Sequence, residues 1–276
     1  MELDWHYYPE THCSTQDLAK EWSAGNLRRT RTECRLDGES CSVDRAALRG
    51  IAVFCTFSQQ KGRGQAGNVW FGGKGDNIAM TLAFYPENLD ASDLFSLDMA
   101  LSLGLLRYAR RIDARCCLKW PNDLYSGLRK LAGILLETRI RGTHVEEVYF
   151  GIGLNMNQEF FPENLPNPIS FRQLDGKVRD LEKESCQLAS DIGNAYDMFL
   201  CQKDKAGERG RLFEIYKKEY LGSMLFYGQW RDFLFRGKRV HARIEDVDEC
   251  GCLWLRDSLD GMFLADIKEL RYCLPV

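Results

Sequence analysis

The composition of the chain is that of a folded globular protein. It has 276 residues, of which 45% are hydrophobic and 28% are charged, with only 7 prolines, so disordered, collagen-like and low-complexity classes are excluded. Lys and Arg number 37 against 40 for Asp and Glu, a formal net charge of −3. With charge this balanced, phosphate-backbone affinity cannot dominate, and a general DNA or RNA binder is disfavoured.

The apolar runs are too short for a membrane span, since the longest covers residues 78–85 and a span needs roughly 18 to 20 residues. Residues 1–4 (MELD) carry acids where a secretory signal needs a basic patch and an apolar run, so we expect a cytoplasmic protein. The 11 cysteines show no zinc-knuckle or Cys-x-x-Cys spacing, and we interpret them as reduced structural thiols.

The apolar periodicity predicts an ordered series of helices and strands. A first helix has its cap at residues 14–17 (STQD) and ends at Gly25, because Ser caps a helix start and Gly a helix end. Strands follow over residues 51–57 and 77–84, on either side of a glycine-rich loop. A helix over residues 93–111 has an apolar stripe at steps of three and four. This stripe consists of Leu94, Leu97, Leu101, Leu105 and Tyr108.

Three further strands are joined by turns, which favours antiparallel pairing; they cover residues 118–120, 131–138 and 145–154. Helical patterns return over residues 181–200 and 210–220. Short alternating runs then indicate a small all-β domain; they cover residues 233–235, 239–244, 252–255 and 262–267. At roughly 150 residues per domain, we expect one large domain, residues 1–224, and one small domain, residues 225–276.

The glycine-rich loop between the first two predicted strands is a candidate anion-binding segment. Residues 62–67 (GRGQAG) match G-x-G-x-x-G, but a dinucleotide fingerprint needs a helix directly afterwards, and here a strand follows. We interpret the loop as a mobile segment that closes on an anion, with free backbone N–H groups and the charges of Lys61, Arg63 and Lys74. Trp70 is placed to stack on a base. The alternative is a solvated hairpin loop.

A second cluster lies at residues 119–123 (KWPND), where a cation, an amide and a carboxylate surround a proline turn. Asp123 is a candidate Mg²⁺ ligand, and the alternative is a purely structural turn. Pairing of residues 118–120 with 131–134 would bring Lys119 close to Lys130. Two like charges at one strand end need an anion between them, so we expect a phosphate or carboxylate ligand there.

Glycines in two later strands indicate places where a ligand approaches the main chain closely. Gly133 lies in the strand that follows Lys130, and Gly151 and Gly153 end the strand before Asn155. Asn155 is a candidate hydrogen-bonding partner of a ribose or phosphate. The alternative is a strand that ends in an asparagine turn.

In their order along the chain these segments resemble the biotin protein ligases, which share a fold with lipoate ligases and octanoyl transferases. The similarity spans residues 14–157, and its most specific part is the pair KWPND at 119–123 and RKLAGIL at 129–135. The resemblance implies an α+β fold of the class II synthetase-like biotin/lipoate ligase type. In that fold helices pack on a mixed, largely antiparallel sheet, and a small SH3-like β-barrel follows at the carboxyl end.

The resemblance also implies a role for individual residues. The biotin-binding set is Ser14, Thr15, Gln59, Arg63, Lys130, Gly133 and Gly151. The nucleotide-binding set is Gly62, Gly64, Gln65, Gly67, Trp70, Lys119, Asn122 and Asn155. The catalytic set is Lys130, Arg63, Lys119 and Asp123, with Asp123 also the expected Mg²⁺ ligand. This chain departs from the family pattern at Gln16, where the family has Asn, and at Gln65, where a second loop arginine is common.

The function implied is a two-step ligation. Biotin and ATP would form biotinyl-5′-AMP with Mg²⁺, and the biotinyl group would pass to a lysine of a biotin carboxyl carrier protein domain, as in a biotin–[acetyl-CoA-carboxylase] ligase. Because the similarity starts at Ser14, we expect no amino-terminal DNA-binding domain and no nucleic-acid or membrane partner, and we leave a homodimer open. The alternatives are a lipoate ligase or octanoyl transferase on this fold, or a non-enzymatic adaptor that binds peptides.

Overall fold

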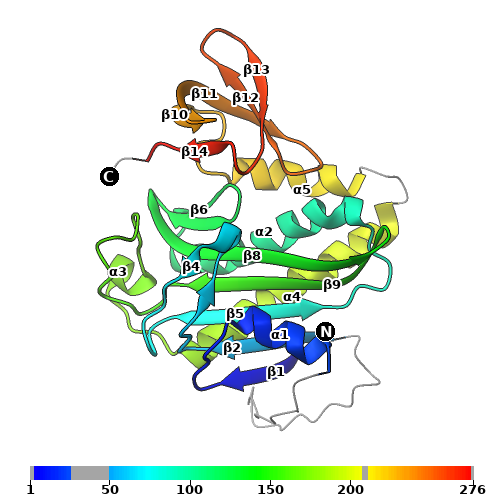
Figure 1. Cartoon of the computed structure of the whole chain (residues 1–276), viewed down its shortest axis with the longest axis vertical. Coiled ribbons are helices and arrows are strands. Elements are labelled where there is room, and N and C mark those ends of the chain that lie inside the picture. The colour runs from blue at the N-terminus through cyan, green and yellow to red at the C-terminus, as the bar shows by residue number, and fades with distance from the viewer. Residues whose placement is uncertain (1–2, 26–49, 207–210, 275–276) are drawn as a thin grey trace.

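The computed structural model of the chain describes residues 3–25, 50–206 and 211–274. Its strands form a seven-stranded sheet in the order β1-β2-β5-β9-β8-β7-β6, a two-stranded hairpin β3-β4, and a five-stranded sheet in the order β13-β12-β11-β10-β14. Figure 1 shows the five-stranded sheet at one end of the molecule, next to helix α5. Among the described residues, no helix combines the length and apolarity that crossing a bilayer would need.

The seven strands of the large sheet are β1 (Leu3–Tyr8), β2 (Ile51–Thr56), β5 (Ile78–Phe84), β6 (Cys116–Lys119), β7 (Asp123–Ser126), β8 (Arg129–Arg141) and β9 (His144–Leu154). Every neighbouring pair is antiparallel except β1 and β2, which are parallel. The expectation of a mixed, largely antiparallel sheet is confirmed. Strand β1 was not predicted, because its WHYY pattern lacks both clean alternation and a turn signal.

Helices cover both faces of this sheet, which explains why its central strands are continuous apolar runs. Helices α2 (Leu94–Ile112) and α4 (Leu181–Ala206) lie behind the sheet in Figure 1, and α1 (Thr15–Ser23) lies in front of it. All residues of β2 and β5 are buried. Helices α2 and α4 approach each other closely at Gly104, where an added Cβ would lie 2.8 Å from the Ala195 Cβ.

The predicted pairing of residues 118–120 with 131–134 is wrong, because β7 intervenes. The turn at Pro121 reverses the chain at once, so that β6 pairs with β7, with Lys119 opposite Asp123, and β7 pairs with β8, with Asp123 opposite Gly133. The short strand β7 contains only four residues, too few for the alternation that would have revealed it. Asp123 is thereby placed between the strands that carry Lys119 and Lys130.

The carboxyl-terminal part forms a five-stranded sheet of β10 (Trp230–Phe235), β11 (Lys238–Val247), β12 (Leu253–Asp257), β13 (Met262–Ala265) and β14 (Leu270–Tyr272). Four of these match the four predicted runs, and the three-residue β14 was missed. Before this sheet, α5 (Arg211–Gly222) covers the predicted helix apart from Gly210, which lies outside the described residues. Leu118 of β6 then hydrogen-bonds to both Ser223 and Leu225. The domain boundary at residue 224 stays a prediction.

Two further elements complete the part near the site. The hairpin consists of β3 (Gly62–Arg63) and β4 (Val69–Trp70), and a short helix α3 (Phe171–Asp175) precedes α4. Figure 1 shows the hairpin in front of the large sheet, on the same side as α1. Most of the predicted glycine loop therefore lies over the sheet.

Candidate functional site

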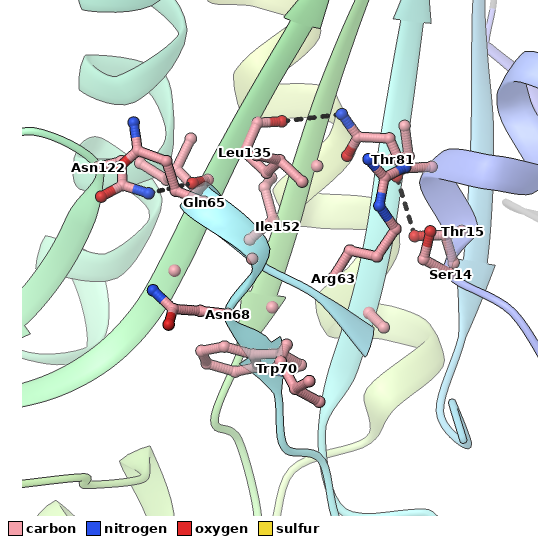
Figure 2. A pocket seen from close by; sticks show the side chains of 18 of the residues that line it. Ser14, Thr15, Arg63, Gln65, Asn68, Trp70, Thr81, Asn122, Leu135 and Ile152 are labelled. Carbon is pink, nitrogen blue, oxygen red and sulfur yellow. Dashed lines mark hydrogen bonds between the residues drawn. The ribbon is translucent and has the colours of Figure 1, made fainter. Parts of the chain in front are cut away.

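A cavity of about 180 Å³ lies between the large sheet, the start of α1 and the β3–β4 hairpin. Figure 2 shows Arg63, Gln65, Asn68 and Trp70 of the hairpin region in front of the strands that carry Leu135 and Ile152. Ser14 and Thr15 stand at one side of the cavity and Asn122 at the other. Segments from both ends of the predicted similarity thus meet in one place.

Most of the residues predicted for the site line this cavity. They are Ser14, Thr15, Gln59, Arg63, Gly64, Gln65, Trp70, Asn122, Asp123, Lys130, Gly133 and Gly151. Four predicted residues do not line it, namely Gly62, Gly67, Lys119 and Asn155. The lining also includes residues that the sequence analysis did not select, among them Asn68, Ala79, Thr81, Leu135 and Ile152. The sequence could have indicated Ala79 and Thr81 as lining residues, because a small and a polar side chain, two residues apart, stand in a strand made mostly of large apolar residues.

Hydrogen bonds fix the end of the cavity nearest α1. Ser14 is the helix N-cap, and its Oγ accepts from the Asp17 N–H at 3.1 Å. The Thr15 N–H donates to Gln59 Oε1 at 2.9 Å, and the hydroxyls of Thr15 and Thr81 lie 2.9 Å apart. Because helix capping and strand pairing both hold these groups, this end of the cavity is formed before any ligand arrives.

The glycines of β8 and β9 make room for side chains of this chain. An added Cβ at Gly153 would lie 2.2 Å from the Trp70 ring, and one at Gly133 would lie 3.2 Å from it. At Gly151 an added Cβ would lie 2.0 Å from Gln16 Oε1. Close approach to the main chain at these glycines was predicted, with a ligand as the approaching group. In this structure Trp70 and Gln16 make that approach.

Gln16 is held in one orientation by its amide group. Its Nε2 donates to the carbonyl oxygens of Leu135 and Tyr149, at 3.1 and 3.2 Å. A carbonyl oxygen only accepts, so the other amide atom, Oε1, must point the opposite way, against Gly151. Gln16 lines the cavity and is 3% exposed. The replacement of the family's Asn therefore places a longer, fixed amide in the cavity wall.

Asp123 is the anion between the two lysines. Its Oδ2 lies 3.3 Å from Lys119 Nζ and its Oδ1 lies 2.5 Å from Lys130 Nζ. Lys119 and Lys130 were predicted to converge with a ligand between them, and the structure corrects this, because the carboxylate of the chain itself separates them. Lys119 Nζ also lies 5.0 Å from the ring centre of Tyr272, which belongs to the five-stranded sheet.

Arg63 closes the cavity at the α1 side through ion pairs. Its guanidinium lies 2.5 Å from Asp17 Oδ1 and 2.9 Å from Glu137 Oε1. Lys20 also reaches Glu137, at 2.9 Å. These contacts tie the β3–β4 hairpin to α1 and to β8. Arg63 and Lys130 line the same cavity, and each is already paired with carboxylates of the chain.

The two candidate asparagines differ in position. Asn122 lines the cavity and donates from Nδ2 to the Ile134 carbonyl at 2.8 Å. Asn155 is 3% exposed, and its Nδ2 donates to the Ile169 carbonyl at 3.0 Å, while its Oδ1 is buried without a hydrogen-bond partner among the described residues. Asn155 joins the end of β9 to the segment before α3, and its predicted contact with a nucleotide stays a prediction.

Comparison with known sequences agrees with this arrangement. Residues 49–155 match the Biotin/lipoate A/B protein ligase family. The chain is 33% identical over 110 residues to the bifunctional ligase/repressor BirA of Escherichia coli, a match that covers 40% of this chain and 34% of BirA. It is 40% identical over 112 residues to the biotin–[acetyl-CoA-carboxylase] ligase of Paracoccus denitrificans, which covers 40% of this chain and 46% of the relative. The match thus spans less than half the length of these relatives.

Solved structures extend the similarity of fold to the whole chain. A biotin protein ligase from Aquifex aeolicus in complex with biotin and ATP superposes with a TM-score of 0.68 at 22% identity, over 99% of both chains. The biotin protein ligase of Leishmania major in complex with biotinyl-5-AMP gives a TM-score of 0.54 at 16% identity, over 96% of this chain and 98% of that one. The predicted fold class is confirmed, including a separate carboxyl-terminal sheet.

Proposed function

We propose, from the premise that this chain carries a domain of the Biotin/lipoate A/B protein ligase family, that it is an ATP-dependent biotin protein ligase. It activates biotin as biotinyl-5′-AMP and transfers the biotinyl group to a lysine of a biotin carboxyl carrier protein domain. The observation that carries this proposal is the single cavity in which Ser14, Gln59, Arg63 and Lys130 come together. Ser14 and Gln59 offer hydrogen-bonding groups for a polar head group, and Arg63 and Lys130 add two cations to the cavity lining.

The first step joins two anions, a carboxylate and the α-phosphate of ATP, so its barrier is mainly electrostatic. Arg63 and Lys130 approach the cavity from different strands, and Lys130 Nζ is oriented by Asp123 at 2.5 Å. Cations fixed in advance need no reorganisation when charge develops at the phosphate, which is the usual source of large rate effects. The β3–β4 hairpin covers the cavity and limits the access of water to the mixed anhydride.

The second step needs an uncharged amine, because an ammonium has no lone pair. A lysine has an ordinary pKa of about 10.4, so a group of the enzyme must take its proton. Asp123, a member of the predicted catalytic set, is the acid of the first cavity that would have to orient or deprotonate this lysine. Both of its oxygens lie against ammonium groups of Lys119 and Lys130, which leaves it poorly placed to receive a proton from a third one.

The residues of the cavity do not fit a protein-held Mg²⁺. Among the described residues that line the cavity, Asp123 is the only carboxylate, and each of its oxygens is paired with a lysine. The described residues contain no group of three or more acidic, histidine or cysteine side chains that could hold a metal ion. We therefore assign no step to a metal bound by this chain, and Asp123 as a Mg²⁺ ligand is a prediction that this geometry does not support.

Mass spectrometry of the reaction products tests the proposal. The protein is mixed with ATP and biotin, and in parallel with lipoate or octanoate, and the acyl adenylate is measured. We expect biotinyl-AMP to accumulate, and to disappear when a carrier domain is added and becomes biotinylated. An adenylate formed only from lipoate or octanoate would instead identify the alternative ligase on the same fold. No adenylate with any acid would contradict the proposal and favour the adaptor.

A further inference from the structure

A second cavity, of about 210 Å³, adjoins the first around the edge of β8. The two cavities share Gln65, Asn122, Ile134 and Leu135 in their walls. On one side, the first part of β8 pairs with β7. After Ile134 that side of β8 has no partner strand within the described part of the chain. The second cavity lies at this uncovered edge, between α2 and a turn of the five-stranded sheet.

Contacts between the two sheets form the outer wall of this cavity. The Trp120 indole N–H donates to the Gly251 carbonyl at 2.8 Å. Gly251 also lies against the ring of Phe95 on α2, where an added Cβ would be 2.9 Å from the ring carbons. Trp120, Phe95 and Gly251 all line the cavity, together with Ile267. The cavity therefore requires the carboxyl-terminal sheet, whose role the first cavity does not explain.

Of the described residues that line the second cavity, Asp98 on α2 is the only carboxylate, and most of the other lining side chains are apolar. Leu135 and Leu136 lie in the wall beside the aromatic side chains. Among the described residues Asp98 makes no hydrogen bond and no ion pair. Burial raises the pKa of Asp98 to about 7. The buried Tyr220 lies near it, and its pKa is raised well above the ordinary value by burial first and then by Asp98.

A carboxylate among apolar side chains is costly when folding removes part of its water and provides no counter-charge, and Asp98 is partly buried in this way. The chemistry that would complete this cavity is a cation on an apolar stem. A lysine side chain has this form, because its methylenes pack on apolar surface while its ammonium seeks an anion. Phosphates and carboxylates, by contrast, would be repelled by Asp98.

We propose that the second cavity receives the acceptor lysine of the carrier protein and that Asp98 binds its ammonium. This inference rests on the proposed ligase function. The apolar walls would hold the methylenes, and Gln65 and Asn122, which line both cavities, would stand where the amine passes to the adenylate. The second sheet would then contribute to acceptor binding through the outer wall of the cavity.

The chemical step balances without any further reactant. The lysine ammonium gives one proton to the Asp98 carboxylate and becomes an amine. Its nitrogen forms a bond to the carbonyl carbon of biotinyl-AMP, the bond from that carbon to the phosphate oxygen breaks, and AMP leaves with the electron pair. The nitrogen releases a second proton to water, and Asp98 returns its own proton to water before the next cycle.

The test uses biotinyl-AMP supplied ready-made and measures single-turnover transfer to a carrier domain by the whole chain. Asp98→Asn keeps the shape of the side chain but cannot take a proton, and we expect transfer to fall about 10²-fold, the effect typical of losing a positioned base. The matched control is Asp204→Asn, since Asp204 is an exposed carboxylate on α4, and it should transfer at the wild-type rate.

Hydroxylamine as the acceptor separates amine binding from effects on the adenylate. It is uncharged at neutral pH and needs no base, so the Asp98→Asn variant should transfer biotin to it as fast as wild type does. Equal losses with hydroxylamine and with the carrier would overturn the proposal, as would wild-type transfer to the carrier by the variant.

A second variant tests the cavity without altering Asp98. Ile267 lines the cavity and is 41% exposed, so Ile267→Trp should narrow the mouth without disturbing the core, and we expect slower transfer to the carrier and unchanged transfer to hydroxylamine. Normal transfer to the carrier would contradict the assigned entry. If the wild-type protein cannot make biotinyl-AMP from ATP but transfers supplied biotinyl-AMP to the carrier, the proposed function would be refuted while the proposal for the second cavity would stand.

Discussion

The two adjoining cavities share part of their walls but differ in whether their charged side chains are paired with opposite charges. In the first cavity every charged side chain has a partner within the chain: Asp123 lies between two lysines, and Arg63 lies between Asp17 and Glu137. In the second cavity Asp98 has no such partner among the residues that the structure describes. The difference indicates that the first cavity is preorganised by its own residues, whereas in our proposal the second is completed when the ammonium of the acceptor lysine enters.

Preorganisation in the first cavity also restricts what its residues can do. An ammonium that a carboxylate already holds in place interacts well with an incoming phosphate, because no further reorganisation free energy is needed to position it. A carboxylate fixed by two ammonium groups is a poor base. In the proposed mechanism the first cavity would bind anions and the second would bind the amine, and this difference follows from which charged side chains are already paired.

The largest expected effect is on adenylate formation in the first cavity. Lys130→Ala should lower biotin-dependent ATP–pyrophosphate exchange by about 10²- to 10³-fold, or about 3 kcal/mol, as for other fixed donors at a developing charge. Lys183→Ala is the matched control, since the Lys183 side chain on α4 is 84% exposed. Near-normal exchange by the Lys130 variant would show that Lys130, paired with Asp123, has only a structural role. The first cavity would then not be the site of anion binding that the comparison assumes.

The next effect concerns how much the Asp98 carboxylate lowers the free energy of unfolding. Between pH 3.8 and about 7 the native state keeps the Asp98 proton that the unfolded state has released, so this group makes the free energy of unfolding fall as the pH rises. A pKa of about 7 in place of 3.8 corresponds to about 4 kcal/mol, and because Asp98 is only partly buried, screening by solvent should reduce the decrease to about 2 kcal/mol. The decrease should be absent in Asp98→Asn. Urea unfolding of both proteins at pH 4, 5.5 and 7 measures it. Parallel curves would mean that Asp98 already has a partner.

A smaller effect is expected where the first cavity is closed by packing. Gly153→Ala places a Cβ within 2.2 Å of the Trp70 ring, so the ring must move, which should cost about 1 to 2 kcal/mol of stability. In a Trp70→Ala background the same change should cost much less, because the two residues are in contact. Thermal unfolding of the four proteins gives the coupling, and additive losses would rule out the packing of Trp70 on β9.

The smallest effect is expected at the half-exposed ion pairs of Arg63. Arg63→Gln removes contacts to Asp17 and Glu137 whose side chains are 36% and 25% exposed, and such pairs contribute up to about 1 kcal/mol. The loss should shrink at high salt, since screening weakens the native pairs. Arg141→Gln, at a side chain that is 86% exposed, serves as control. A larger loss that salt leaves unchanged would mean that Arg63 is held by packing and not by charge.

Particular elements and residues show what the sequence could predict about this fold and site and what it could not. Periodicity located α2, β5 and β9 closely, because buried stripes and apolar runs reflect burial directly. It missed β7 and β14, which have four and three residues. Asp98 carried no signal at all, because one acid in a helical stripe is read as a solvated position.

The amino-acid sequence by itself predicted a resemblance to the biotin protein ligases, the class of fold and most of the residues that surround the first cavity, because motifs and apolar periods are local properties of the chain. Only the tertiary structure decided which charges are compensated. Asp123 met its two lysines through strand register, and Gln16 and Trp70 met the glycines of β8 and β9 across the sheet. Asp98 on α2 faces a turn of the five-stranded sheet with no charged partner in the described part of the chain. Such pairings depend on distances between segments far apart in the chain, which no local pattern encodes.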